Sequence, residues 1–197
     1  MEIAVEEGNG RVPVLFGTSH FTTSPVIELS KYAEDVGADR VIVTPPLFGP
    51  IRSTRSLIKH YRAIVSAVEI PIVIQDAEED THMCSTFIGK LFKDENIRYV
   101  KVEGIESSTK IQEILELTEM IIFGGTAGKQ LLEELILGAK GDMPGCAIPE
   151  LTAEPYKEFI KGNDEKAKVI LTSIVHIWNS LRCILYRLVN WRKKRLG

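Results

Sequence analysis

The strongest constraint on the fold is a repeated pattern, in which short apolar runs alternate with helical patterns at a spacing of roughly 25–30 residues. The pattern predicts six strands, at residues 12–17, 40–44, 71–76, 97–103, 120–125 and 141–146. Continuous apolar strands of this kind are typical of a parallel sheet that is covered on both faces. Six consecutive βα units fit either a doubly wound sheet or most of a (β/α)8 barrel. A complete barrel usually needs roughly 250 residues, so 197 residues fall short by about two units.

Composition narrows the class of protein. Hydrophobic residues make up 44% of the chain and charged residues 26%, which excludes a mainly disordered chain and a coiled-coil rod. The net charge of −3 is uneven, because residues 177–197 contain basic residues and no acidic ones. The acidic remainder argues against a nucleic-acid-binding surface over most of the chain. The acidic N-terminus is not a secretory signal, and the three scattered cysteines fit neither a disulfide framework nor a zinc site, so we expect a cytoplasmic protein.

A helical tail is predicted over residues 163–197, beyond a barrel-like domain over residues 1–162. Apolar residues step by three and four from Leu171 to Leu188 and make a broad apolar face. We expect this face to pack on the domain or on a partner subunit. The alternative is a helix on a membrane surface, with the basic cluster at 192–195 meeting anionic lipid.

Functional groups of parallel α/β folds gather at the carboxyl ends of the strands. Lys101 lies inside an otherwise apolar strand, where a lysine is costly unless it is paired or used. Glu103 follows two residues later, so both side chains point to the same face of the strand. A desolvated lysine beside a carboxylate is the arrangement needed to attack a ketone and form an imine. The alternative interpretation is an ordinary ion pair at a strand end.

Other strand-end residues carry weaker signals. The four histidines have no ligand-like spacing; His60 and His82 fall on predicted helices and are expected at the surface, whereas His20 ends a strand. Gly124 and Gly125 follow a strand and fit either a tight βα turn or a phosphate cradle, with the turn favoured. They match neither a Walker loop nor a dinucleotide fingerprint.

Several segments, in order, resemble the dihydrodipicolinate synthase / N-acetylneuraminate lyase family. The similar segments are Arg11-Val12-Pro13-Val14 with Gly17-Thr18, Ala33-Glu34 with Gly37-Ala38-Asp39, Val43-Thr44-Pro45-Pro46, residues 97–103, Phe123-Gly124-Gly125, Glu133-Glu134-Leu135, Gly138-Ala139-Lys140-Gly141 and residues 145–150. They are most similar to the branch that dehydrates 2-keto-3-deoxy sugar acids such as keto-deoxy-arabonate. Gln75-Asp76 stands where the best-known members have a Tyr-Asn pair.

The resemblance implies an α/β fold, an incomplete TIM (β/α)8 barrel that lacks the first two βα units, with C-terminal helices. The absent units would include the loop that binds the substrate carboxylate. A reversal of strand order, as in a doubly wound sheet, would contradict this prediction. Because an exposed parallel edge invites association, we expect the tail or a second subunit to cover the open side.

The implied function is a lyase that acts on a 2-keto acid through a lysine Schiff base, as a sugar-acid dehydratase or aldolase. Lys101 would form the imine, and Glu103 and Thr44 would assist proton transfer. Thr18, Gln75, Asp76, Gly125 and Gly145 are the expected substrate-binding residues. The family needs no metal or organic cofactor, and its members are usually oligomers. Two alternatives remain: a non-catalytic or truncated paralogue, and a phosphate-binding barrel enzyme.

Overall fold

The six strands form one parallel sheet whose spatial order follows the chain, in a computed structural model that describes residues 1–46, 53–77, 83–104, 106–145 and 149–173. The strands are β1 (Leu15–Gly17), β2 (Arg40–Val43), β3 (Ile72–Asp76), β4 (Tyr99–Val102), β5 (Ile121–Gly124) and β6 (Gly141–Asp142). Each strand pairs in parallel with the next, without a crossover. This order confirms the predicted sequential sheet and excludes the doubly wound alternative.

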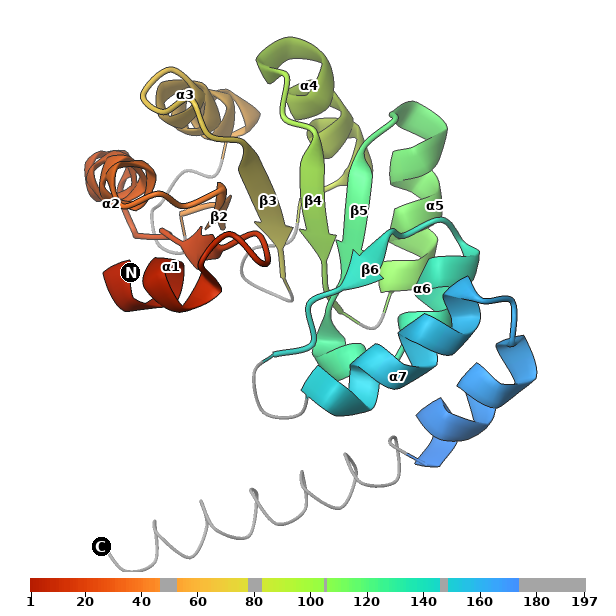
Figure 1. The fold of residues 1–197 in the computed structure, drawn as a ribbon. Helices are drawn as coiled ribbons and strands as arrows, with labels where there is room; N and C mark the ends of the chain where they lie inside the picture. The colour runs from red at the N-terminus through yellow and green to blue at the C-terminus, as the bar shows by residue number, and fades with distance from the viewer. Residues whose placement is uncertain (47–52, 78–82, 105, 146–148, 174–197) are drawn as a thin grey trace, which may run out of the picture.

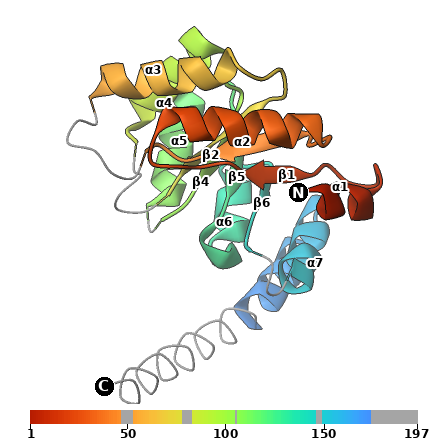
Figure 2. The same cartoon turned by 90° about the vertical axis from the view of Figure 1, so that its left-hand side faces the viewer.

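The helices that connect the strands form an outer layer around the sheet (Figure 1). They are α2 (Thr23–Asp35), α3 (Thr54–Val65), α4 (Ser85–Glu95), α5 (Ser107–Leu117), the short 3-10 helix η1 (Thr126–Gly128) and α6 (Leu131–Ile136), and α7 (Pro149–Ile160) follows the last strand. Figure 2 shows the same outer layer from the side, with α2 and α3 next to each other. Sequential parallel strands with helices outside confirm the incomplete (β/α)8 barrel.

The main core lies between the sheet and the outer helices. Outward-facing strand residues such as Val41, Val100 and Ile122 are fully buried and pack with helix residues such as Ile88 and Ile111. The strands therefore have one face closed by helices, while the other face lines the inside of the half-barrel. Strand alternation sends neighbouring residues to these two faces in turn.

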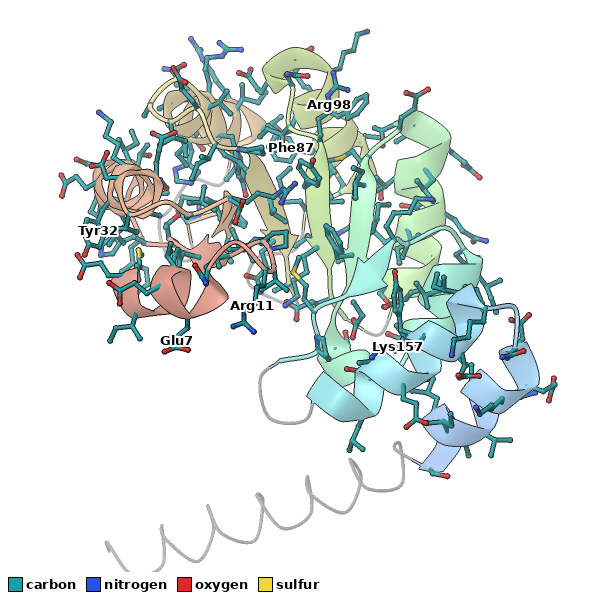
Figure 3. The ribbon with its side chains drawn as sticks, in the orientation of Figure 1. Glu7, Arg11, Tyr32, Phe87, Arg98 and Lys157 are labelled. Carbon is teal, nitrogen blue, oxygen red and sulfur yellow. The ribbon has the colours of Figure 1, made fainter. Side chains whose placement is uncertain are left out.

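A short N-terminal helix, α1 (Glu2–Gly8), precedes the first strand and was not predicted from the sequence. The Tyr32 hydroxyl of α2 donates to Glu2 Oε1 at 3.0 Å, and the Arg11 guanidinium donates to the Glu7 carbonyl at 2.6 Å. Figure 3 labels Glu7, Arg11 and Tyr32 in this region. The helix has no buried residue, which explains why apolar patterning could not reveal it.

The chain beyond α7 continues as a helix over residues 164–173. Leu171 packs there with Leu131 and Leu135 of α6 in a second, smaller apolar cluster. The first residue of the predicted tail stripe is thus in contact with the domain. The rest of the stripe and the basic cluster lie outside the described residues. None of the described helices has both the length and the apolar content needed to cross a membrane.

Candidate functional site

Two neighbouring strands bring three polar side chains together on the inner face of the sheet. Gln75 of β3 lies beside Lys101 of β4 in the strand register. Lys101 Nζ lies 2.9 Å from Glu103 Oε1, and Gln75 Nε2 donates to Glu103 Oε2 at 2.8 Å. The Glu103 carboxylate is therefore held by a different donor at each oxygen. The predicted pairing of Lys101 with Glu103 is confirmed, and Gln75 belongs to the same cluster.

The cluster is half-buried. The Lys101 and Glu103 side chains are 13% and 21% exposed, which distinguishes them from a freely solvated pair. Burial opposes the charge on Glu103, but the hydrogen bonds from Lys101 and Gln75 outweigh it and keep the pKa of Glu103 below its usual value. Glu103 is thus an anion at neutral pH, in contact with the lysine amine and still within reach of solvent.

The turn after β5, residues 125–128, forms one wall of this cluster. A Cβ at Gly125 would lie 2.5 Å from Glu103 Cγ, so any larger residue at this position would displace the Glu103 side chain. The Gly104 N–H donates to Thr126 Oγ1 at 2.9 Å and ties the turn to the end of β4. Thr126 and Ala127 both have positive φ, which marks a tight turn. The closeness of the Glu103 carboxylate disfavours a bound phosphate here, because two anions would repel each other.

Thr44 and Gly145 follow β2 and β6, at the carboxyl-end edge of the sheet. The Thr44 N–H donates to Ser19 Oγ at 2.9 Å. Thr44 Oγ1 is buried and has no hydrogen-bond partner among the described residues. Gly145 is exposed and has a φ of +99°, a backbone conformation that favours glycine. Ser19 and Thr126 are positioning groups that sequence reasoning did not assign.

Thr18 and Asp76 face the outer layer and are not brought to Lys101. Thr18 is fully buried, and its Oγ1 lies 2.9 Å from Ser30 Oγ of α2. Asp76 forms an ion pair with Lys110 of α5, and its Oδ1 accepts the Met83 N–H at 2.7 Å. Asp76 directly follows Gln75, so strand alternation sends it to the opposite face. The rule that pairs Lys101 with Glu103 therefore separates Gln75 from Asp76.

The expectation that His60 lies at the surface was wrong. His60 of α3 is only 4% exposed, and its Nδ1 lies 2.9 Å from Thr23 Oγ1 of α2. Burial lowers the pKa of His60 to about 4. The helix turns this histidine, with its neighbour Tyr61, towards α2 and the sheet. His20 is exposed, as a strand-end residue can be, and His82 lies outside the described residues.

Metal chemistry has no visible site in the part of the chain that the structure describes. No group of three or more histidine, cysteine, aspartate or glutamate residues gathers there in a way that would hold a metal ion. The chemically distinctive feature is Lys101, which lies on an inner strand of the sheet and forms an ion pair with Glu103.

The fold is that of a (β/α)-barrel protein. Its inward lysine–carboxylate pair lies at the carboxyl ends of the strands, the edge of the sheet where barrel proteins carry their functional sites. The edge is identified by Arg98, labelled in Figure 3, which precedes β4 and marks the opposite, amino-terminal edge. Comparison with known proteins gives the family. The chain belongs to the dihydrodipicolinate synthetase family, whose model matches residues 1–197.

Similar proteins include two 4-hydroxy-tetrahydrodipicolinate synthases. The one from Methanospirillum hungatei is 36% identical over 177 residues, covering 86% of this chain and 60% of the relative. The one from Acetivibrio thermocellus is 29% identical over 187 residues, covering 92% of this chain and 62% of the relative. The chain therefore spans about three fifths of the length of these relatives.

Solved structures agree with the fold. The dihydrodipicolinate synthase from Aquifex aeolicus superimposes with a TM-score of 0.82 at 26% identity, over 91% of this chain and 63% of that one. The chloride-inhibited enzyme from Acinetobacter baumannii, complexed with pyruvate, gives a TM-score of 0.82 at 26% identity, over 92% of this chain and 64% of that one.

Proposed function

We propose that this chain carries the lysine of a lyase that acts on 2-keto acids through a Schiff base. The observation that carries the proposal is the cluster of Lys101, Glu103 and Gln75, in which a half-buried amine contacts an ionised carboxylate. Family membership supports it, as does the similar structure from Acinetobacter baumannii, which was solved with the 2-keto acid pyruvate.

The first step is attack by the amine. Lys101 Nζ must lose a proton before it attacks, and Glu103 Oε1, at 2.9 Å, is an acceptor within hydrogen-bond distance. The neutral amine adds to the C2 carbonyl of the keto acid, and the carbonyl oxygen leaves as water, which produces a protonated imine. Gln75 keeps the carboxylate beside the amine during this exchange.

The protonated imine then acts as an electron sink. Removal of a proton from C3 gives an enamine, and the enamine expels the C4 hydroxyl group as water. Glu103, or the Thr44 hydroxyl, carries the proton in these steps, since Thr44 Oγ1 is buried without a partner among the described residues. Hydrolysis of the imine releases the product and restores the amine. In a retro-aldol cleavage, the C4 hydroxyl group would lose its proton and the C3–C4 bond would break, which would give the enamine of pyruvate on the lysine and release the rest of the chain as an aldehyde.

The substrate class that we propose is a 2-keto-3-deoxy sugar acid. Gln75 supports this choice, because it occupies the position of the proton-relaying tyrosine in the best-known members of the resembled family. An amide donates a hydrogen bond but does not relay a proton as a phenol does, so the proton transfers fall to Glu103. The Gly125 and Gly145 backbones would line the mouth of the site.

The test is reduction with borohydride in the presence of pyruvate. We expect the mass of one reduced pyruvate adduct on the wild-type protein and none on Lys101→Arg. The Glu103→Gln variant, which keeps the lysine, should form the adduct more slowly. Folded wild-type protein that gives no adduct would overturn the proposal.

A second candidate function is a non-catalytic member of the family. The chain spans 62% of one relative and 60% of another. Catalysis needs the groups that orient the substrate as well as the reacting amine. Calorimetric titration with pyruvate distinguishes the two candidates: a non-catalytic member binds weakly or not at all.

A further inference from the structure

Two carboxylates meet on the outer face of the sheet, behind the wall of the lysine site. Asp142 of β6 lies opposite Gly124 of β5 in the strand register, and Glu134 reaches the same place from α6. A Cβ at Gly124 would lie 1.7 Å from Glu134 Oε2 and 3.0 Å from Asp142 Oδ1. Both carboxylates therefore face the space that the missing side chain of Gly124 leaves free.

The two carboxylates have few partners among the described residues. Glu134 is fully buried, and Ser107 Oγ lies 2.6 Å from its Oε1. Glu134 Oε2 and both carboxylate oxygens of Asp142 are buried without a hydrogen-bond partner among the described residues. No ion pair within the described part of the chain involves either residue. Keeping two buried carboxylates charged in this situation is costly, so a proton is the simplest ligand that would stabilise the pair.

The surroundings of the two carboxylates favour their protonated form. Burial and, after it, the charge of Glu134 raise the pKa of Asp142 to about 7, and Glu103 adds to this rise. The charge of Lys101 and the backbone N–H of Met143 act in the opposite direction. Burial also raises the pKa of Glu134, with a further contribution from Glu133. Among the described side chains, α5, α7 and β5 contribute the uncharged residues Ser107, Thr152 and Gly124 nearby.

The pair is in contact with the turn that lines the lysine site. A Cβ at Gly128 would lie 3.3 Å from Asp142 Oδ2, and the Gly128 N–H donates to the Gly125 carbonyl at 3.0 Å. Gly125 in turn packs directly against Glu103. A change in the separation of the two carboxylates therefore acts on residues 125–128, and through them on the Glu103 side chain.

We propose that Glu134 and Asp142 form an acid pair that holds one proton between them at neutral pH, and that loss of this proton loosens the 125–128 turn beside Lys101. The proton site does not depend on the proposed function. Its effect on the keto-acid site rests on the proposed function.

The first test is thermal unfolding of the full chain as a function of pH. Asp142→Asn removes the charge and keeps the shape of the side chain. The melting temperature of this variant, relative to that of the wild type, should therefore increase by several degrees as pH rises from 5 to 8. Glu116→Gln, an exposed acid on α5, is the matched control and should follow the wild-type curve. A melting difference that does not change with pH would overturn the proton site. If Asp142→Asn does not fold, Glu134→Gln replaces it with the same expected trend.

The second test measures the turn itself. Hydrogen exchange of the segment over residues 125–130, corrected for the intrinsic effect of pH, should be faster at pH 8 than at pH 6 in the wild type and equal at both in Asp142→Asn. Equal exchange in the wild type would overturn the coupling to the turn.

A cation is the rival ligand for the pair. A rise in the wild-type melting temperature when Mg²⁺ or K⁺ is added at pH 8, absent in Asp142→Asn, would assign the pair to a cation and overturn the proton. Both tests proceed without a keto acid, so a failed borohydride reaction with a positive melting result would remove the proposed function and leave the proton site intact.

Discussion

Two lysine–carboxylate pairs end neighbouring strands of this sheet, and they differ in which side of the sheet they occupy. Lys101 and Glu103 lie on the inner face and are 13% and 21% exposed. Lys110 and Asp76 lie on the outer face, between the sheet and α5, and are 7% and 1% exposed. The chemistry of the two pairs is the same. The inner pair remains within reach of a ligand, whereas the outer pair is closed by a helix.

The difference teaches that strand alternation, rather than residue type, separates reactive groups from structural ones. Gln75 and Asp76 are adjacent in the sequence, yet Gln75 binds Glu103 and Asp76 binds Lys110. Gly124 and Gly125 divide in the same way, one against Glu134 and the other against Glu103. Substitutions on the outer face should therefore change stability, and substitutions on the inner face should change reactivity.

The largest effect is expected from breaking the outer pair. Asp76→Asn leaves the buried Lys110 ammonium without its carboxylate, which costs about 3–5 kcal/mol in the free energy of unfolding. Glu103→Gln, the matched change on the inner face, should cost about 1 kcal/mol because that pair is more exposed. Urea unfolding followed by circular dichroism measures both. Equal losses would contradict the distinction between the two faces.

The next largest effect concerns the buried histidine of the outer layer. With its pKa lowered to about 4, His60 stays neutral in the folded protein while the unfolded chain takes up a proton below its ordinary value of 6.5. Stability is therefore complete above pH 6.5 and falls by up to about 3 kcal/mol as pH decreases towards 4. Urea unfolding at several pH values should show a smaller acid loss for His60→Gln than for the wild type. His20→Gln, at an exposed position, should retain the wild-type loss; an identical loss in all three proteins would refute the assignment.

The two adjacent glycines sharpen the comparison. Gly124→Ala places a methyl group 1.7 Å from Glu134 Oε2, and we expect it to destabilise the fold by about 1–3 kcal/mol through overpacking of the outer layer. Gly125→Ala displaces Glu103 instead, so borohydride trapping of pyruvate should slow by about tenfold or more. Unfolding and trapping are measured on both variants. The distinction fails if Gly124→Ala slows trapping as much as Gly125→Ala does.

The smallest effect separates two threonines. Thr18→Val removes the buried hydrogen bond to Ser30 and should cost about 1 kcal/mol of stability, with trapping unchanged. Thr44→Val removes a hydroxyl that has no partner among the described residues, so stability should hold while trapping slows. The opposite pattern would place Thr18 in the site and Thr44 in the structure.

Much of the fold could be predicted from the sequence, because apolar runs and helical spacing report burial directly. The order of the strands required the family resemblance, since periodicity alone fitted a doubly wound sheet as well. The helix α1 escaped prediction because none of its residues is buried. The burial of His60 was not predicted, because the sequence does not show which element packs against the face of the helix that carries it.

The part of the candidate site that lies on a single strand could be predicted from the sequence. Lys101 and Glu103 are two residues apart, so their common face follows from alternation alone. The contact of Gly125 with Glu103, and the support from Ser19 and Thr126, depend on how separate strands and turns come together. The acid pair of Glu134 and Asp142 likewise depends on the register between β5 and β6. No local pattern reports such long-range contacts.

The most direct test of the central claim is to locate the trapped lysine. The wild-type protein is reduced with borohydride in the presence of pyruvate, digested, and mapped by mass spectrometry across the peptides that carry Lys101, Lys110 and the exposed Lys140. The account predicts one adduct, on Lys101, with Lys110 and Lys140 unmodified. An adduct on Lys110, or adducts spread over exposed lysines such as Lys140 with Lys101 unmodified, would contradict the assignment of the inner pair as the reactive one.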